Sequence, residues 1–303
     1  MSRRGGALFA AMCVIWGIPY LLIRVAVRDL SPATVVCGRT AIAAVMLLPV
    51  AAWRGALRDL WSQWPWLLLY TGLEVTGPWL LLSNAEEHLS SSLSGLLVAA
   101  VPLVGIVLSR LTGGDEVVDR RRLAGLAIGF GGVVALVGLQ LGHIDLAAVA
   151  QVGGVAVGYA AGPLVLARRL SQLPSLGVVA MSLTITAVVY APFAATSHPD
   201  HASGQVIASM AGLGVVCTAL AFLLFFALIS EIGPTRATVI TYVNPAVAIA
   251  LGVVALGEHL TVGMVVGFPL VLIGSVLATA QRSPAAPAEA VSSTALEADL
   301  RSG

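Results

Sequence analysis

Residues 207–229 read IASMAGLGVVCTALAFLLFFALI, an apolar stretch without a charged side chain. A helix of this length can cross the roughly 30 Å of hydrocarbon in a bilayer. Strands are not expected, because an open sheet edge cannot satisfy its backbone groups in lipid. The stretch therefore predicts a membrane-spanning α-helix.

Similar apolar stretches recur along the whole chain. Of its 303 residues, 58% are hydrophobic and 10% are charged, whereas a soluble domain is about 25% charged. A soluble fold could not hide so much apolar surface from water. We therefore predict an all-α polytopic membrane protein with ten transmembrane helices, at 7–27, 33–53, 64–83, 90–111, 121–139, 146–167, 174–195, 207–229, 236–256 and 262–280.

The arginines predict the orientation of these helices. All 16 basic residues are arginine. If the N-terminus lies inside, the outer loops hold only Arg24 and Arg28, while Arg39 falls within a span and the others lie on the inner side. Positive charge concentrates on the cytoplasmic side of membrane proteins. We therefore expect a multi-pass protein of the cell membrane with both termini in the cytoplasm.

The chain also resembles itself at a shift of about 143 residues, as the positions of its prolines and glycines show. Pro102 corresponds to Pro245, and Glu116 corresponds to Glu258. Five helices per half would make the second half enter the membrane from the opposite side, an inverted repeat that is typical of secondary transporters. The predicted units are a first five-helix repeat, a second one and a disordered cytoplasmic tail: 1–139, 140–280 and 281–303.

Motifs in both halves resemble those of the EamA-like transporters of the drug/metabolite transporter superfamily. Residues 233–245 read GPTRATVITYVNP, and Leu256-Gly257-Glu258 follows. The first half departs from this pattern, with Gly113-Gly-Asp-Glu116 in place of Leu-Gly-Glu. The resemblance implies ten helices in two inverted repeats, a central cavity, and export or exchange of small metabolites, amino acids or drugs. The first-half residues that carry it are Trp16-Gly17, Pro32, Arg39, Pro102, Glu116 and Gly125.

The repeat favours a secondary transporter that works by alternating access. The alternatives are an intramembrane enzyme, which would need a nucleophile with its base or a metal cluster within the spans, and a non-transporting receptor or scaffold. Without lysine, the chain has neither a P-loop nor a Schiff-base cofactor site. We expect no enzyme activity, no cofactor, no metal and no nucleic acid. The expected partners are a small-molecule substrate, the lipid bilayer and a coupled proton, with substrate, direction and monomeric or dimeric state left open.

Two ionisable side chains, Arg39 and Glu74, fall well inside predicted spans. A charge at this depth costs about 2.5–3.5 kcal/mol and must face a cavity or a partner. In one interpretation they pair and hold two adjacent helices together. In the other, Glu74 titrates in a cavity and couples proton movement to transport, or Arg39 binds an anionic substrate.

Aromatic and polar residues of other spans are further candidates for lining a substrate cavity. The alternative is that the aromatic rings face lipid or anchor the membrane interface, and that Asn244 bonds one helix to another. These candidates are Trp16, Tyr20, Trp79, Tyr159, Tyr242 and Asn244.

Prolines inside spans each remove a backbone hydrogen bond. The resulting kinks are either hinges for transport or static bends, at Pro19, Pro102, Pro163 and Pro245. Small residues four apart allow close approach of helix backbones, which we assign to packing, at Gly125/Gly129, Gly154/Gly158 and Gly263/Gly267.

Overall fold

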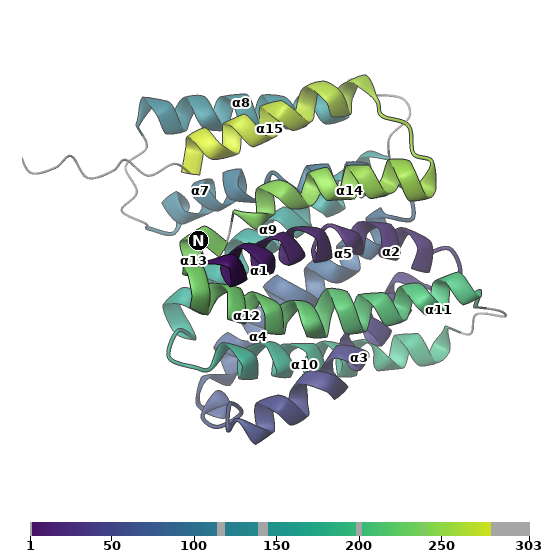
Figure 1. Ribbon diagram of the computed structural model, residues 1–303, viewed down its shortest axis with the longest axis vertical. Helices are drawn as coiled ribbons and strands as arrows, with labels where there is room; N and C mark the ends of the chain where they lie inside the picture. Colours follow the sequence, from purple (N-terminus) through teal and green to yellow (C-terminus); the bar gives the residue numbers. More distant parts are fainter. Residues whose placement is uncertain (1, 114–118, 139–144, 198–201, 238, 280–303) are drawn as a thin grey trace, which may run out of the picture.

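The computed structural model describes residues 2–113, 119–138, 145–197, 202–237 and 239–279. Within these ranges the chain is helical and has no strand. Its helices lie side by side and stack into an elongated bundle (Figure 1). Glu116 and the predicted tail at 281–303 lie outside the described residues.

The first half of the bundle contains straight and interrupted helices. Several short helices follow one another directly. The π-helix η2 interrupts the run of α4 and α5, and the 3-10 helix η1 directly precedes α4. The elements are α1 (Arg3–Ile15), α2 (Ile18–Ala26), α3 (Pro32–Trp53), η1 (Leu60–Gln63), α4 (Trp64–Thr71), η2 (Gly72–Thr76), α5 (Gly77–Ala85), α6 (Ser91–Val98), α7 (Val101–Leu111) and α8 (Arg120–Gly138).

The second half follows the same plan, again with one π-helical interruption, η3. Its elements are α9 (Leu146–Arg169), α10 (Ser175–Thr196), α11 (Gly204–Ala211), η3 (Gly212–Leu220), α12 (Ala221–Ile232), α13 (Pro234–Ala237), α14 (Ile240–Leu256) and α15 (Val262–Thr279).

Eight helical stretches among the described residues are long and apolar enough to cross a membrane, and Ile240–Leu256 is a shorter apolar helix. The remaining predicted span is the consecutive run of α4, η2 and α5, which carries Glu74 in its middle. The prediction of a helical, multi-pass membrane protein is confirmed. The number of ten spans stays a prediction.

Helix starts follow from local sequence. Ser31, Ser90 and Ser203 cap α3, α6 and α11, each through a side-chain oxygen that accepts a backbone N–H. Pro19 and Pro102 lie in the first turns of α2 and α7, where a missing N–H costs nothing. They therefore begin a second helical segment after a break, whereas Pro163 and Pro245 lie inside α9 and α14.

Helices that are far apart in sequence form the main contacts of the bundle. The helix α3 packs on α10, α6 on α14, and α8 on α15, while α1 lies against α12 and α5 against α9. Figure 1 shows α8 and α15 together at one edge of the bundle.

Glycines make the contact between α8 and α15 possible. A Cβ on Gly132 would lie 2.7 Å from the backbone nitrogen of Val271 and 2.8 Å from the oxygen of Gly267. A Cβ on Gly125 would lie 2.8 Å from the oxygen of Gly274. The two backbones therefore touch, and the assignment of Gly125 and Gly267 to packing is confirmed.

Candidate functional site

The side chain of Arg39 lies inside the bundle, where only 8% of it is exposed. It projects from α3, and its Nε donates to Oγ1 of Thr218 over 2.8 Å. Its guanidinium carbon lies 3.7 Å from the centroid of the Trp79 ring. One hydrogen bond and one ring face thus hold the cation, and its two terminal amino groups make no hydrogen bond to a described residue.

Both π-helical segments lie next to this region of the bundle. The segment η3 contributes Thr218, whose Oγ1 also donates to the carbonyl oxygen of Leu213 over 2.7 Å. In η2, the carbonyl oxygen of Thr76 accepts from the Tyr190 hydroxyl over 2.9 Å, from α10. A π-segment leaves carbonyl groups outside the regular helical pattern, and such segments are frequent at functional sites.

The side chain of Glu74 packs against α9 and not against Arg39. Its carboxylate packs against the backbone of Gly162 on α9, where a Cβ would collide with it. Its Oε2 is buried and has no hydrogen-bond partner among the described residues. The described contacts include no ion pair between Arg39 and Glu74: the guanidinium contacts Thr218 and Trp79, and the Glu74 carboxylate contacts Gly162. The contacts of the described residues therefore give no support to the interpretation of a pair that joins two helices, and that interpretation stays a prediction.

Three of the predicted aromatic residues gather around Arg39. Trp79 stacks on its guanidinium, and both Tyr20 and Tyr159 lie close enough to interact with it electrostatically. The rings come from α5, α2 and α9, so three helices besides α3 wall the cation. Tyr159 also lies within electrostatic reach of Glu74, which places the carboxylate at the edge of this group.

The other predicted cavity residues lie elsewhere. Trp16 packs on Phe222 and Phe225 of α12, with ring centroids 6.1 and 4.6 Å away. The Tyr242 hydroxyl lies 2.8 Å from Oγ1 of Thr279 on α15.

Asn244 also joins two helices. With its amide oriented to satisfy both polar atoms, it donates to the carbonyl oxygens of Cys13 (3.1 Å) and Ile240 (2.9 Å). In this conformation Trp16, Tyr242 and Asn244 therefore make helix–helix contacts.

The predicted site residues do not include Glu86, Arg24 or the serines at the start of α6. Glu86 follows α5 and is completely buried, although its sequence context of Asn, Glu and His reads as an exposed connection. Glu258, known only as part of a motif, accepts hydrogen bonds from the start of α6. The internal repeat could have indicated part of this cluster. It makes α6 and α14 equivalent helices, and the residue after α14, Glu258, contacts the start of α6.

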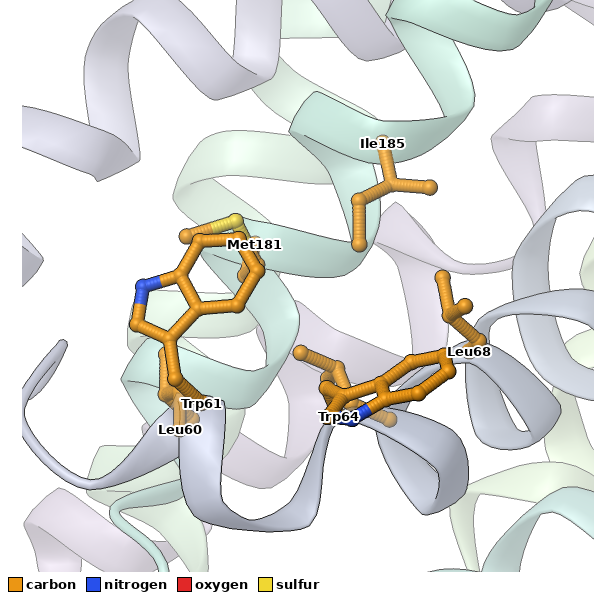
Figure 2. A pocket seen from close by; sticks show the side chains of 7 residues that line it. Leu60, Trp61, Trp64, Leu68, Met181 and Ile185 are labelled. Atoms are coloured by element: carbon orange, nitrogen blue, oxygen red, sulfur yellow. The ribbon is translucent and has the colours of Figure 1, made fainter.

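An apolar depression lies away from all of these residues. Figure 2 shows its side chains from η1, α4 and α10, with Trp61 and Trp64 at its rim. None of the predicted site residues lines it, and both tryptophans are exposed. Its lining is Leu60, Trp61, Trp64, Leu67, Leu68, Met181 and Ile185.

Metal-ligating side chains do not gather in the part of the chain that the structure describes: no group of three His, Cys, Asp or Glu residues could hold an ion there. Cys13, Cys37 and Cys217 are free thiols. The chemistry of the site is therefore that of a buried cation, aromatic faces and isolated carboxyl groups.

Comparison with known proteins gives a consistent result. The "Uncharacterized transporter YvbV" of Bacillus subtilis is 26% identical over 294 residues and covers 96% of each chain. A "Probable amino-acid metabolite efflux pump" of Salmonella typhimurium is 24% identical, covering 90% of this chain and 94% of its own. A "Probable terminal-alkyne amino-acid exporter" of Streptantibioticus cattleyicolor is 25% identical over 88% of both.

A solved crystal structure has the same fold, with a TM-score of 0.65 and 20% identity over 91% of this chain and 96% of that one. The EamA-like transporter family matches residues 3–138 and 147–280, which is nearly the whole length of the helical bundle. This chain is a multi-pass membrane transporter and belongs to the EamA-like transporter family.

Proposed function

We propose that this protein is a secondary active transporter that exports or exchanges a small metabolite, in particular a compound with a carboxylate such as an amino acid or a related drug. Two relatives carry names of amino-acid or amino-acid metabolite exporters. The proposal assigns no covalent chemistry to the chain. The transported compound binds within the bundle and leaves unchanged.

The observation that carries the substrate class is the buried cation of Arg39. A guanidinium inside a membrane protein is energetically costly. It is therefore expected to pair with an anion or to serve a function. No carboxylate of the described residues forms an ion pair with it, and its terminal amino groups remain available. A planar guanidinium binds a carboxylate through two parallel hydrogen bonds. The substrate carboxylate is thus the partner that the protein itself does not supply.

The walls of the site fit an amphipathic compound. Trp79, Tyr20 and Tyr159 present aromatic faces beside the guanidinium. Aromatic walls with a few fixed polar groups are typical of small-molecule sites. The hydroxyl of Tyr159 offers an additional hydrogen bond to a polar substituent.

The mechanism that we propose is alternating access between two inverted repeats of five helices. The contacts support it, since α3 packs on α10, α6 on α14 and α8 on α15, each at the same position in its half. The contact of α1 with α12 also has its counterpart in the contact of α9 with α5. Exchanging the conformations of two such halves converts one access state into the other.

The proposed orientation places both termini and the arginine-rich ends in the cytoplasm. Figure 1 shows α1 beginning and α15 ending at the same end of the bundle, near α13 with Arg236. Arg24 lies near the opposite end of α1–α2. This distribution follows the excess of positive charge on cytoplasmic sides. The repeats are proposed to be 1–139 and 140–280.

The test is transport by purified protein in liposomes loaded with labelled amino acids, their methyl esters, nucleosides and sugars. We expect counterflow of a carboxylate compound and not of its ester. Arg39→Gln should lower that flux by about tenfold or more, as loss of a buried charge partner does. Arg28→Gln removes an exposed arginine and is the matched control. Equal flux of acid and ester, or full activity of Arg39→Gln, would contradict the proposal.

A further inference from the structure

Glu86 is a buried carboxyl group without a hydrogen-bond donor. It directly follows α5, its side chain is 0% exposed, and neither carboxylate oxygen has a partner among the described residues. Its neighbour Glu87 is exposed. An ionised carboxylate is strongly disfavoured at such a place, because it has lost water and gained no donor.

The charged groups around Glu86 do not compensate for this loss. Arg24 of α2 donates to the backbone oxygen of Glu86 and not to its carboxylate. Burial raises the pKa of the Glu86 carboxyl well above its ordinary value; Arg24 opposes this shift and Glu258 adds to it. The titratable or charged groups that face Glu86 are Arg24 and Tyr20 from α2, Arg39 from α3, Tyr159 from α9, and Glu258 from the connection between α14 and α15.

A second structural unit covers the same end of the bundle. Glu258 accepts from the backbone nitrogens of Ser91 (2.8 Å) and Ser92 (3.0 Å), and from the Ser92 hydroxyl (2.5 Å). Gly257, with φ +66°, ends α14 and turns the chain toward α6. We call Glu258, Ser91 and Ser92 the outer clasp. It ties the second half of the chain to the first helix turn of α6, where a carboxylate is favoured by the free N–H groups.

We propose that Glu86 is a proton-binding site of the transporter, and that the outer clasp closes over it only when it carries a proton. This inference rests on the proposed transport function and adds the coupling ion to it. When the outer clasp closes, the Glu86 carboxylate takes one proton from the outer water and becomes a neutral carboxylic acid. The proton leaves to the inner water when the bundle opens on that side, around Arg39.

The direction of coupling follows from the burial of Glu86. The clasp-closed conformation binds the proton more tightly than the open one, so outer acid favours closure and outer alkali favours opening. A proton that enters from outside during closure drives the return of the empty carrier. Inward proton movement is thereby coupled to outward movement of substrate.

The labelling rate of a cysteine placed in the outer clasp measures how often the clasp opens, and this measurement needs no substrate. Ser91 is suitable, because its backbone N–H makes the bond to Glu258 while its own hydroxyl is buried without a partner. We would label Ser91→Cys in proteoliposomes with a membrane-impermeant maleimide at several outer pH values. The same cysteine in Glu86→Gln and in Glu87→Gln corrects for the ionisation of the thiol itself, and the protein without Ser91→Cys gives the background of the native thiols.

We compare the labelling rate of Ser91→Cys alone with that of Ser91→Cys combined with Glu86→Gln. The ratio of the two rates is expected to rise with outer pH above the ordinary glutamate pKa of about 4.3, approaching tenfold per pH unit for a single linked proton. Glu87→Gln should behave as the unmodified clasp. A flat ratio, or the same change in Glu87→Gln, would overturn the proposal.

Measurements of substrate flux test proton binding at Glu86 separately from transport itself. With any compound that the wild type moves, Glu86→Gln should retain counterflow and lose its dependence on outer pH. Loss of counterflow in Glu86→Gln would assign the carboxylate to a cationic group of the substrate and overturn the proton site. If the wild type moves no compound, the transport proposal fails, and the labelling experiment alone decides whether Glu86 and the clasp are coupled.

Discussion

The Nε of Arg39 on α3 and Oγ1 of Thr218 in the π-segment η3 are joined by a 2.8 Å hydrogen bond that connects the two halves of the chain. Thr218 accepts this bond and donates its own proton to the oxygen of Leu213. Its hydroxyl hydrogen is therefore fixed, and the guanidinium is held in one orientation. The position of the cation depends on a local distortion of the helix that faces it.

Replacement of Thr218 by valine should disturb this arrangement without a large change in volume. The Arg39 Nε and the Leu213 oxygen would both lose a partner, which costs about 1–3 kcal/mol for each buried group left unsatisfied. We expect lower thermal stability in detergent and a several-fold rise in the KM for a carboxylate substrate. Thr184→Val is the control, since among the described residues the Thr184 hydroxyl bonds only to the Ala180 oxygen of its own helix. An unchanged KM would separate Thr218 from substrate binding.

Arg39 and Glu74 should be only weakly coupled in their effects on stability. A buried ion pair would give a large coupling in a double-mutant cycle, because breaking one costs about 3–5 kcal/mol. The structure shows no such pair, so the coupling between Arg39→Gln and Glu74→Gln in unfolding should stay well below this value, although Tyr159 lies near both side chains. The measurement is reversible unfolding of both single variants and the double variant in mixed micelles. Strong coupling would restore the paired interpretation.

The glycine contact between α8 and α15 gives a prediction about stability alone. Gly132→Ala places a Cβ 2.7 Å from the Val271 nitrogen, and overpacking of this kind costs about 1–3 kcal/mol. Gly131→Ala is a closely matched control, because a Cβ there meets nothing within 4 Å. We expect a clear drop in melting temperature for Gly132→Ala and none for Gly131→Ala, whose alanine favours the helix. Equal melting temperatures would show that α15 can move away from α8.

A loop carboxylate should contribute stability that acid removes. Asp29 accepts from the backbone nitrogen of Ser203 over 3.0 Å and ties the end of α2 to the start of α11. The hydrogen bonds of Ser203, with help from Arg28, lower the pKa of Asp29 below its ordinary value. A lowered pKa means that this contribution is present above the ordinary carboxyl pKa of about 3.9 and is lost as pH falls through the folded value.

Asp29→Asn should therefore be less stable than the wild type near neutral pH, and the difference in melting temperature should shrink toward acid. Asp59→Asn is the control, because Asp59 is exposed and asparagine tolerates its left-handed backbone, φ 63°. A difference that stays constant with pH would mean that the Asp29 carboxylate charge is not involved.

The sequence predicted the helices well because lipid leaves the chain few alternatives. An apolar run such as 174–195 must be helical to satisfy its backbone, and the structure has α10 at Ser175–Thr196. The breaks were harder to predict. Pro19 reads as a kink in a continuous span, yet it lies in the first turn of a new helix because Trp16 and Gly17 end the previous one.

The candidate site was predicted only in part, for a reason that Glu86 illustrates. Which face of a helix is buried against protein and which against lipid is not encoded in hydropathy, since both faces are apolar. Arg39, Trp79 and Tyr159 could be selected as unusual residues, but their meeting point depends on crossing angles between helices. Glu86 looks like part of a polar connection, yet its side chain is completely buried, with Arg24 of α2 and Glu258 of a distant connection near it.

The backbone contact between α8 and α15 has a consequence for how the protein is made. The ribosome synthesises α8 long before α15. The glycine face of α8 therefore lies in the membrane without its partner helix until synthesis is nearly finished. Assembly of the first half is thus completed only by the last helix of the chain. A chain that ends before Val262 would leave this face open to lipid and to quality-control proteases.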